Sequence, residues 1–157
     1  MRNKKGFTLV ELLVAATIIG VLAVFATIQL RKSAAETRWT QAKAKADALA
    51  FAVYRAKVDY PSLSFTNVPV QKSTSLNNCT YRRGIGEVNP NTLIACGYLE
   101  NSGWTDEYFA YYVCNDGCDG YIAWVEVQSS ARLPGEYKSY KYYAHPSREG
   151  KEQKTGE

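Results

Sequence analysis

The 157-residue sequence predicts an α+β fold, in which one long N-terminal helix packs against a small antiparallel sheet. Three observations predict this fold. A long apolar run near the start of the chain continues into an alanine-rich stretch without Gly or Pro. Three aromatic, strand-like runs follow in the last third, separated by turn residues. Four cysteines, all in the second half, favour loops that are stapled by disulfides.

The chain begins with a basic leader, residues 1–6 (MRNKKG), followed by an apolar run over residues 7–30. A helix of that length spans the roughly 30 Å of hydrocarbon in a bilayer. No convincing small-x-small signal-peptidase site follows the run, so we expect the segment to be retained. The basic leader predicts a cytoplasmic N-terminus and a C-terminal part outside the bacterial inner membrane.

Residues 31–59 are expected to extend the same helix as an amphipathic half. Residues 31–58 contain nine alanines and neither Gly nor Pro, which is a strongly helical composition. Apolar residues recur there at alternating steps of four and three, which predicts one buried stripe. The stripe comprises Ala35, Trp39, Ala42, Ala46, Leu49, Val53, Ala56 and Tyr60. Pro61 then ends the pattern, so one helix is predicted over residues 7–59.

Residues 60–144 are predicted to form a globular domain of loops and antiparallel strands. Its first part is rich in loop residues and contains one short element, TLIACGYLE, which is either a helix or a strand. Strand-like runs follow at residues 107–114, 121–128 and 137–143, and NDGCDG between the first two is a hairpin signal. We expect three or four strands, with the helix stripe covering one face. Residues 145–157 lack an apolar anchor and are predicted to be a mobile tail.

The cysteines are predicted to form disulfides, because their number is even and their domain lies outside the cytoplasm. Their spacing lacks the paired CxxC signature of a zinc site, so no metal is expected there. A Cys114–Cys118 bond would tie the mouth of the hairpin, and Cys79–Cys96 would staple the long loop region. Four cysteines permit three pairings, and the sequence leaves the choice among them open.

Charge and composition argue against several classes of function. The formal net charge is +4, and removing the leader cations Arg2, Lys4 and Lys5 leaves +1 for residues 7–157. This near-neutral remainder gives no electrostatic footprint for nucleic acid. The only histidine, His145, lies beside Pro146 in the predicted tail, and nothing suggests a nucleophile near it. The chain is therefore predicted to be neither an enzyme nor a protein with a cofactor.

Glu11 is the unusual residue of the apolar run, because residues 12–30 carry no charge at all. An acid in lipid costs about 2.5–3.5 kcal/mol even on insertion scales, and such residues usually mark function and have a partner. No Lys, Arg or His lies within one helical turn on its C-terminal side. We therefore expect its partner to come from elsewhere.

The stretch GFTLVELLV, from Gly6 to Val14, resembles the prepilin N-terminal motif of type IV pilins and of the pseudopilins of type II secretion. The resemblance covers residues 1–58 in sequence and organisation, and the globular part only in layout. It implies a pilin-like fold, cleavage between Gly6 and Phe7 by a prepilin peptidase, and N-methylation of Phe7. It also implies polymerisation into a helical filament, together with assembly machinery and minor pilins, after a stage in the inner membrane.

The resemblance gives Glu11 a role in assembly. Cleavage creates an α-amino group on Phe7 with a reference pKa of about 7.7–8.0, so it is cationic at neutral pH. The amine of a neighbouring subunit can pair with Glu11 inside the filament and set the register. Ala16, Gly20, Ala23 and Thr27 form a ridge of small residues that allows close helix packing. Many family members have a proline at the position of Ile28, where the helix locally melts, and this sequence does not.

The predicted function is a pilin, a structural subunit of a homopolymeric type IV pilus-like filament that is extracellular or periplasmic. Two disulfides and a long polar loop favour a surface pilus over the alternative, a type II secretion pseudopilin. A monomeric, membrane-anchored binding domain is a third hypothesis. Major pseudopilins bind calcium through a loop, and Asn115, Asp116 and Asp119 could supply oxygen ligands as a weaker alternative. Their spacing does not fit an EF-hand, and ordinary turn chemistry explains them better, so no metal is expected.

Overall fold

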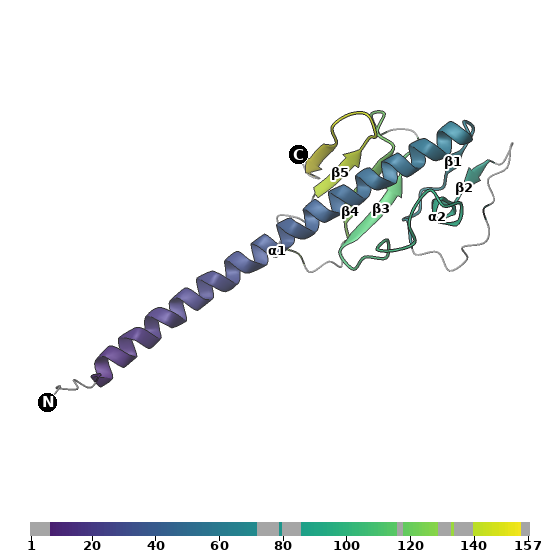
Figure 1. The fold of residues 1–157 in the computed structure, drawn as a ribbon. Helices are drawn as coiled ribbons and strands as arrows, with labels where there is room; N and C mark the ends of the chain where they lie inside the picture. Colours follow the sequence, from purple (N-terminus) through teal and green to yellow (C-terminus); the bar gives the residue numbers. More distant parts are fainter. Residues whose placement is uncertain are drawn as a thin grey trace. The chain divides into compact units, whose positions relative to one another are not determined.

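The computed structural model describes residues 7–71, 79, 86–115, 118–128, 133 and 140–154. The chain divides into two compact units, Met1–Thr37 and Arg38–Glu157. A single helix, α1 (Leu9–Asp59), contributes to both units, and all strands belong to the second one (Figure 1). The observed helix confirms the prediction of one long helix over residues 7–59 to within two residues.

The second unit is built around the C-terminal half of α1. Most of the predicted stripe is buried there, with Trp39, Ala42, Ala46, Leu49, Val53 and Ala56 all at most 4% exposed, whereas Tyr60 at its end is only partly buried. Ala50 and Ala52 are also buried and widen the buried face beyond the prediction. Short alanine side chains allow the helix backbone to approach the sheet closely, and Leu49 and Trp39 fill the larger spaces.

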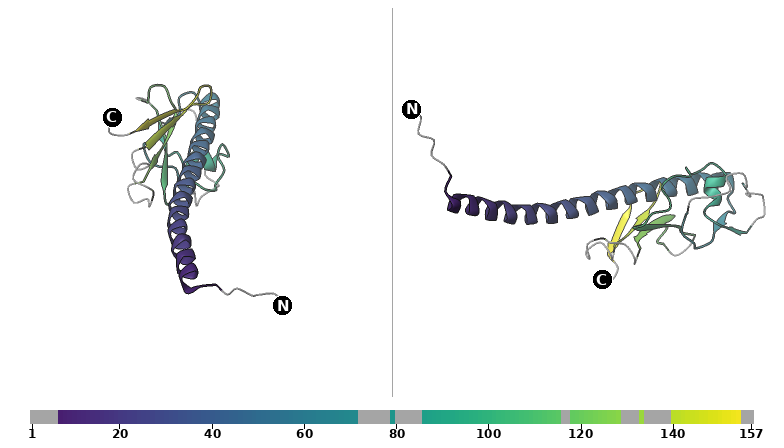
Figure 2. Two further views of the ribbon diagram at one scale, coloured as in Figure 1. Left: turned by 90° about the vertical axis from the view of Figure 1, so that its left-hand side faces the viewer. Right: turned by 90° about the horizontal axis from the view of Figure 1, so that it is seen from below.

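Four antiparallel strands form the main sheet of this unit. They are β3 (Phe109–Val113), β4 (Ala123–Val127), β5 (Tyr140–Ala144) and β6 (Lys151–Lys154), in the spatial order β3-β4-β5-β6. Burial alternates strictly along β3 and β4, so that alternate side chains face the helix. The rings of Trp39 and Phe109, 5.8 Å apart, join helix to sheet, and Figure 2 shows α1 passing over one face of the strands.

The prediction of a mobile tail over residues 145–157 was wrong for β6, which is a paired strand. Lys151–Lys154 pairs with β5, although all four side chains are exposed and none is apolar. Glu152 anchors the strand to α1, since its Oε1 accepts a hydrogen bond from Trp39 Nε1 at 3.0 Å and its Oε2 lies 3.2 Å from Lys43 Nζ. Backbone pairing and polar contacts hold this edge strand, and they leave no hydrophobic signal in the sequence.

Two short strands and one short helix organise the loop region. β1 (Ser64–Phe65) pairs in parallel with β2 (Glu87–Val88), and α2 (Thr92–Ala95) is the element predicted from TLIACGYLE. Both expected disulfides are present, joining Cys79 to Cys96 and Cys114 to Cys118. The structure therefore selects one of the three pairings that the sequence left open.

Candidate functional site in the N-terminal helix

The first half of α1 is a helix without an intramolecular core. None of the residues 7–34 is buried, and the exposed side chains include Phe7 (82%), Leu22 (61%) and Phe25 (63%). Within the described residues, α1 is the one helix that is long and apolar enough to cross a membrane. So many exposed large apolar side chains are unfavourable in water, so this segment must be covered by lipid or by other chains.

Glu11 has a partner within its own helix. The backbone N–H of Thr8 and its hydroxyl Oγ1 each donate to Glu11 Oε2 at 2.9 Å, and Glu11 N–H donates to Thr8 Oγ1 at 3.3 Å. The carbonyl of Thr8 accepts from Leu12 N–H at 3.2 Å, as an N-cap residue does. Thr8 and Glu11 therefore form a capping box that satisfies donors at the start of the helix.

The expectation that the partner of Glu11 must come from elsewhere was incomplete, because sequence reasoning missed Thr8. Its signal is present in the chain, since Thr8 is followed three residues later by Glu11 at the start of an apolar run. Both hydrogen bonds from Thr8 fall on one oxygen of the carboxylate, Oε2. No described group bonds Oε1, so one oxygen of Glu11 remains available for another partner.

The predicted processing site lies directly before this cap. Gly6 and the leader, residues 1–6, lie outside the described residues, and Phe7 is exposed immediately before Thr8. Residues 1–27 match the family model described as the prokaryotic N-terminal methylation motif.

The chain carries the signature of type IV pilins and pseudopilins. The motif implies processing by a prepilin peptidase and assembly into a pilus or pseudopilus, which is a structural role. Together with the apolar helix, it fits anchoring in the inner membrane as a single-span protein. No curated protein and no solved structure matches the chain.

The small residues predicted to pack against other helices lie on one face of the N-terminal half of α1. Ala16, Gly20, Ala23 and Thr27 follow steps of four, three and four along a regular helix, so they share one face. A Cβ atom added at Gly20 would meet nothing within 4 Å, so this side of the helix is open. The hydroxyl of Thr27 donates to the carbonyl of Val24 at 2.8 Å and is thus already satisfied in an apolar environment.

The helix is unbroken at Ile28, where many pilins have a proline. This continuity agrees with the absence of proline from the sequence at that position. A regular helix satisfies its interior backbone groups internally, which is what a membrane span requires.

The oxygen groups proposed for calcium are engaged with the protein itself. The side-chain amide of Asn115 accepts from Phe65 N–H at 2.9 Å and donates to the carbonyl of Phe65, and Asp119 Oδ2 lies 3.3 Å from Lys151 Nζ. Asp116 lies outside the described residues. The contacts of Asn115 tie the strand β1 to the end of β3, which is a structural role.

Proposed function

We propose that this chain is a pilin that polymerises through its N-terminal helix into a type IV pilus-like filament. The observation that carries the proposal is the uncovered apolar helix over residues 7–34, which begins at a capped carboxylate beside the predicted cleavage point. Burying one large apolar side chain contributes about 1.5–3 kcal/mol, so covering this helix supplies a large driving force away from water. The bilayer covers it first, and a bundle of identical helices covers it in the filament.

Leaving lipid for a helix bundle removes no apolar surface from water, so other interactions must favour assembly. The ridge of Ala16, Gly20, Ala23 and Thr27 allows close van der Waals contact between helices. Glu11 supplies a second interaction, which depends on how the neighbouring helices are aligned. With Oε2 held by Thr8, the carboxylate presents Oε1 to the α-amino group on Phe7 of a neighbouring subunit. The resulting buried ion pair would fix the register between subunits.

Processing precedes assembly in this proposal. The chain enters the inner membrane with its leader in the cytoplasm and residues 38–157 in the periplasm. The prepilin peptidase cuts between Gly6 and Phe7, and the new amine is methylated. Processed subunits then join the assembly machinery and minor pilins. Mass spectrometry of assembled subunits should give Phe7 as the first residue, and subunits that still begin at Met1 would contradict this order.

The decisive experiment separates the charge of Glu11 from its capping role. Glu11→Gln keeps an acceptor that can cap the helix but removes the charge, whereas Thr8→Val removes the capping hydroxyl and keeps the charge. Glu11→Gln should sharply reduce filament yield at equal levels of processed subunit, because the neighbour's amine is then buried without a counter-charge. Such a loss corresponds to about 3–5 kcal/mol. Thr8→Val should reduce yield much less.

Glu11→Leu provides a second arm, because it removes an intramembrane charge and should insert at least as well as the natural chain. Its processing should proceed, since Gly6 and the leader are unchanged, while its assembly should fail. Normal filament numbers from both Glu11 variants would refute the ion pair. Normal yield in Glu11→Gln together with a defect in Thr8→Val would reduce Glu11 to a helix cap.

A pseudopilin of a type II secretion system is the second candidate, because the matched motif is common to both classes. The two differ in where the polymer is found. Fibres sheared from the cell surface of a strain that produces this chain, and absent after its deletion, support the pilin. A secretion defect on deletion, with surface fibres unchanged, supports the pseudopilin. A chain that remains monomeric under both conditions would instead be a membrane-anchored binding domain.

A further inference from the structure

A small polar groove lies in the second unit between α1 and the start of β3. Its volume is about 230 Å³, and Arg38, Gln41 and Lys45 line it from the helix. Asp106 and Tyr111 line it from the strand side. The assembly proposal uses none of these residues.

Tyr111 lines this groove and carries an unusual hydroxyl. Tyr111 is 0% exposed, and its hydroxyl is the one buried side-chain polar atom in the described part of the chain without a hydrogen-bond partner. Burial, assisted by the charge of Asp106, raises the pKa of this hydroxyl, so it stays protonated and is a donor. A buried donor without an acceptor is costly, and a native structure usually supplies one.

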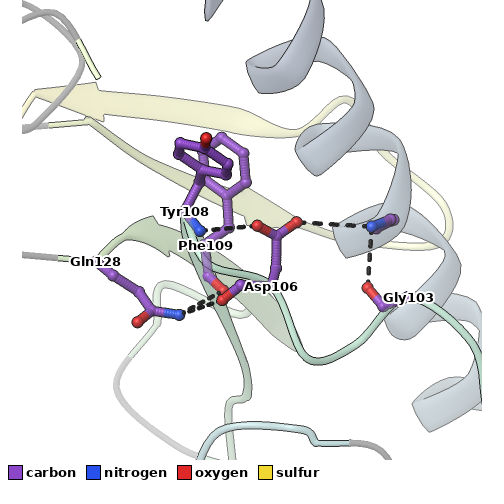
Figure 3. Close-up of polar contacts among 6 residues, drawn as sticks. Gly103, Asp106, Tyr108, Phe109 and Gln128 are labelled. Carbon is purple, nitrogen blue, oxygen red and sulfur yellow. Dashed lines mark hydrogen bonds and ion pairs between the residues drawn. The ribbon is translucent and has the colours of Figure 1, made fainter. Parts of the chain in front are cut away.

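Two cations face the same space. Lys45 Nζ donates to the carbonyl of Gly103 at 2.9 Å, lies 3.8 Å from Asp106 Oδ2 and stands 5.8 Å from the ring centre of Tyr111. Figure 3 labels the residues of both acceptors, Asp106 and Gly103. The guanidinium of Arg38 lies 4.4 Å above the ring of Tyr108 and forms no hydrogen bond or ion pair within the described residues.

Carboxylates are scarce around these donors. Asp106 is the one carboxylate among the described residues that line the groove, and its Oδ1 already accepts from Tyr108 N–H at 2.8 Å. Its backbone carbonyl accepts from Gln128 Nε2 at 2.7 Å, which fixes the loop in place (Figure 3). The described lining of the groove therefore has two cations against one engaged carboxylate.

We propose that this groove binds a carboxylate group, received by Arg38, Lys45 and the hydroxyl of Tyr111. One net positive charge matches a monoanion, and a guanidinium fork binds the two oxygens of a carboxylate in a planar arrangement. The carboxylate comes from an acidic side chain of a second copy of this chain or from a free carboxylic acid. The inference stands independently of the proposed filament function, because it rests on the second unit alone.

The first test uses the full-length chain in detergent micelles, with sodium acetate as the probe and sodium chloride at equal ionic strength as the reference. Thermal unfolding is followed by tryptophan fluorescence, because all three tryptophans lie in residues 38–157. Acetate should raise the midpoint above its value in chloride, since a ligand that binds the folded state stabilises it. The rise should disappear in Arg38→Gln and in Tyr111→Phe.

The variants carry their own controls. Tyr111→Phe keeps the buried ring and removes the unpartnered hydroxyl, so without acetate it should be at least as stable as the natural chain. Arg55→Gln removes a cation of the same helix outside the groove and should keep the acetate response. An equal response to acetate and chloride, or an unchanged acetate response in Tyr111→Phe, overturns the proposal.

The second test identifies the source of the carboxylate. A zero-length carbodiimide is applied to a mixture of ¹⁴N- and ¹⁵N-labelled chains, and mixed-isotope peptides report links between copies. A link from Lys45 to an acid of another copy, suppressed by acetate and absent in Lys45→Arg, identifies a second copy. An acetate response without that link identifies a free acid, and the absence of both results refutes the site.

Discussion

The two halves of α1 differ in a way that composition alone does not suggest. The N-terminal half carries most of the large apolar side chains of the helix, and none of residues 7–34 is buried. The C-terminal half carries mostly alanine on its apolar face, and these alanines form part of the core. In this chain burial is decided by the presence of a partner surface and not by the size of the apolar side chain.

The polar side chains of the two halves differ in where their hydrogen-bond partners lie. In the N-terminal half the hydroxyls bond to their own helix, as Thr17 does with the carbonyl of Val14 at 2.8 Å. In the C-terminal half, polar side chains bond to residues far away in the sequence. For example, the carboxylate of Asp47 accepts a hydrogen bond from the hydroxyl of Tyr142 at 2.9 Å. The first half is therefore self-sufficient in hydrogen bonding, which suits lipid, and the second half depends on its tertiary structure.

The largest expected effect comes from making the same change in both halves. Leu49 is 0% exposed and Leu22 is 61% exposed. Leu49→Ala should destabilise the second unit by about 2–5 kcal/mol, because it leaves a cavity in the core. Leu22→Ala should leave its stability unchanged. Urea unfolding of the full chain in detergent, followed by tryptophan fluorescence, measures both.

A matched loss of stability in the two leucine variants would show that the N-terminal half has a core of its own. A fall in filament yield for Leu22→Ala, with folding unchanged, would instead confirm that its partner is another subunit.

The next effect compares the two disulfides of the second unit. Cys79–Cys96 closes a loop with a sequence separation of 17, and Cys114–Cys118 closes one with a separation of 4. By loop-closure entropy, replacing the first pair by serine should cost about 3 kcal/mol and replacing the second about 2 kcal/mol. Urea midpoints of the two double variants give the order, and a reversed order would show that strand pairing around residues 114–118 depends on the bond.

A smaller effect is expected at the contact between β6 and α1. Glu152→Ala leaves the N–H of Trp39 buried without an acceptor, since Trp39 is 4% exposed, and should cost about 1–3 kcal/mol. Glu152→Gln keeps an acceptor for Trp39 and loses only the half-exposed ion pair with Lys43, which contributes about 0–1 kcal/mol. Equal losses in the two variants would assign the stabilisation to the charge of Glu152.

Much of the fold could be predicted from the sequence because apolar periodicity records burial. The stripe from Trp39 to Ala56 predicted the core face of the helix, and alternating aromatic runs predicted β3 and β4. The predicted run 137–143 overlaps β5, observed as Tyr140–Ala144, and its residues 137–139 lie outside the described residues. Strand β6 was not predicted, because a charged edge strand, KEQK, is held by backbone hydrogen bonds that any sequence can make.

At the candidate site, Glu11 was found because a charge in an apolar run is conspicuous. Thr8 was missed because a hydroxyl group at the start of such a run is not unusual. Phe7 and Glu11 became significant through the spacing of the motif. The free Oε1 of Glu11 depends on which oxygen Thr8 engages, and no sequence pattern records that choice. The groove at Tyr111 was likewise beyond prediction, because its donors come from parts of the chain far apart in sequence.

The smallest predicted effect tests whether the N-terminal half is self-sufficient. Thr8→Val removes the hydroxyl that donates to Glu11 Oε2 and accepts from Glu11 N–H, so the first turn of α1 should fray. Loss of an N-cap costs about 1 kcal/mol, which corresponds to an approximately fivefold faster exchange of the first-turn amides. Hydrogen exchange of residues 9–12 in micelles measures this, while the urea midpoint of the second unit should not move.

Thr8→Ser should behave as the natural chain, and Glu11→Gln should keep the protection because glutamine also completes a capping box. Protection that survives in Thr8→Val but disappears in Glu11→Gln would mean that the carboxylate charge, through its attraction to the helix dipole, stabilises the first turn.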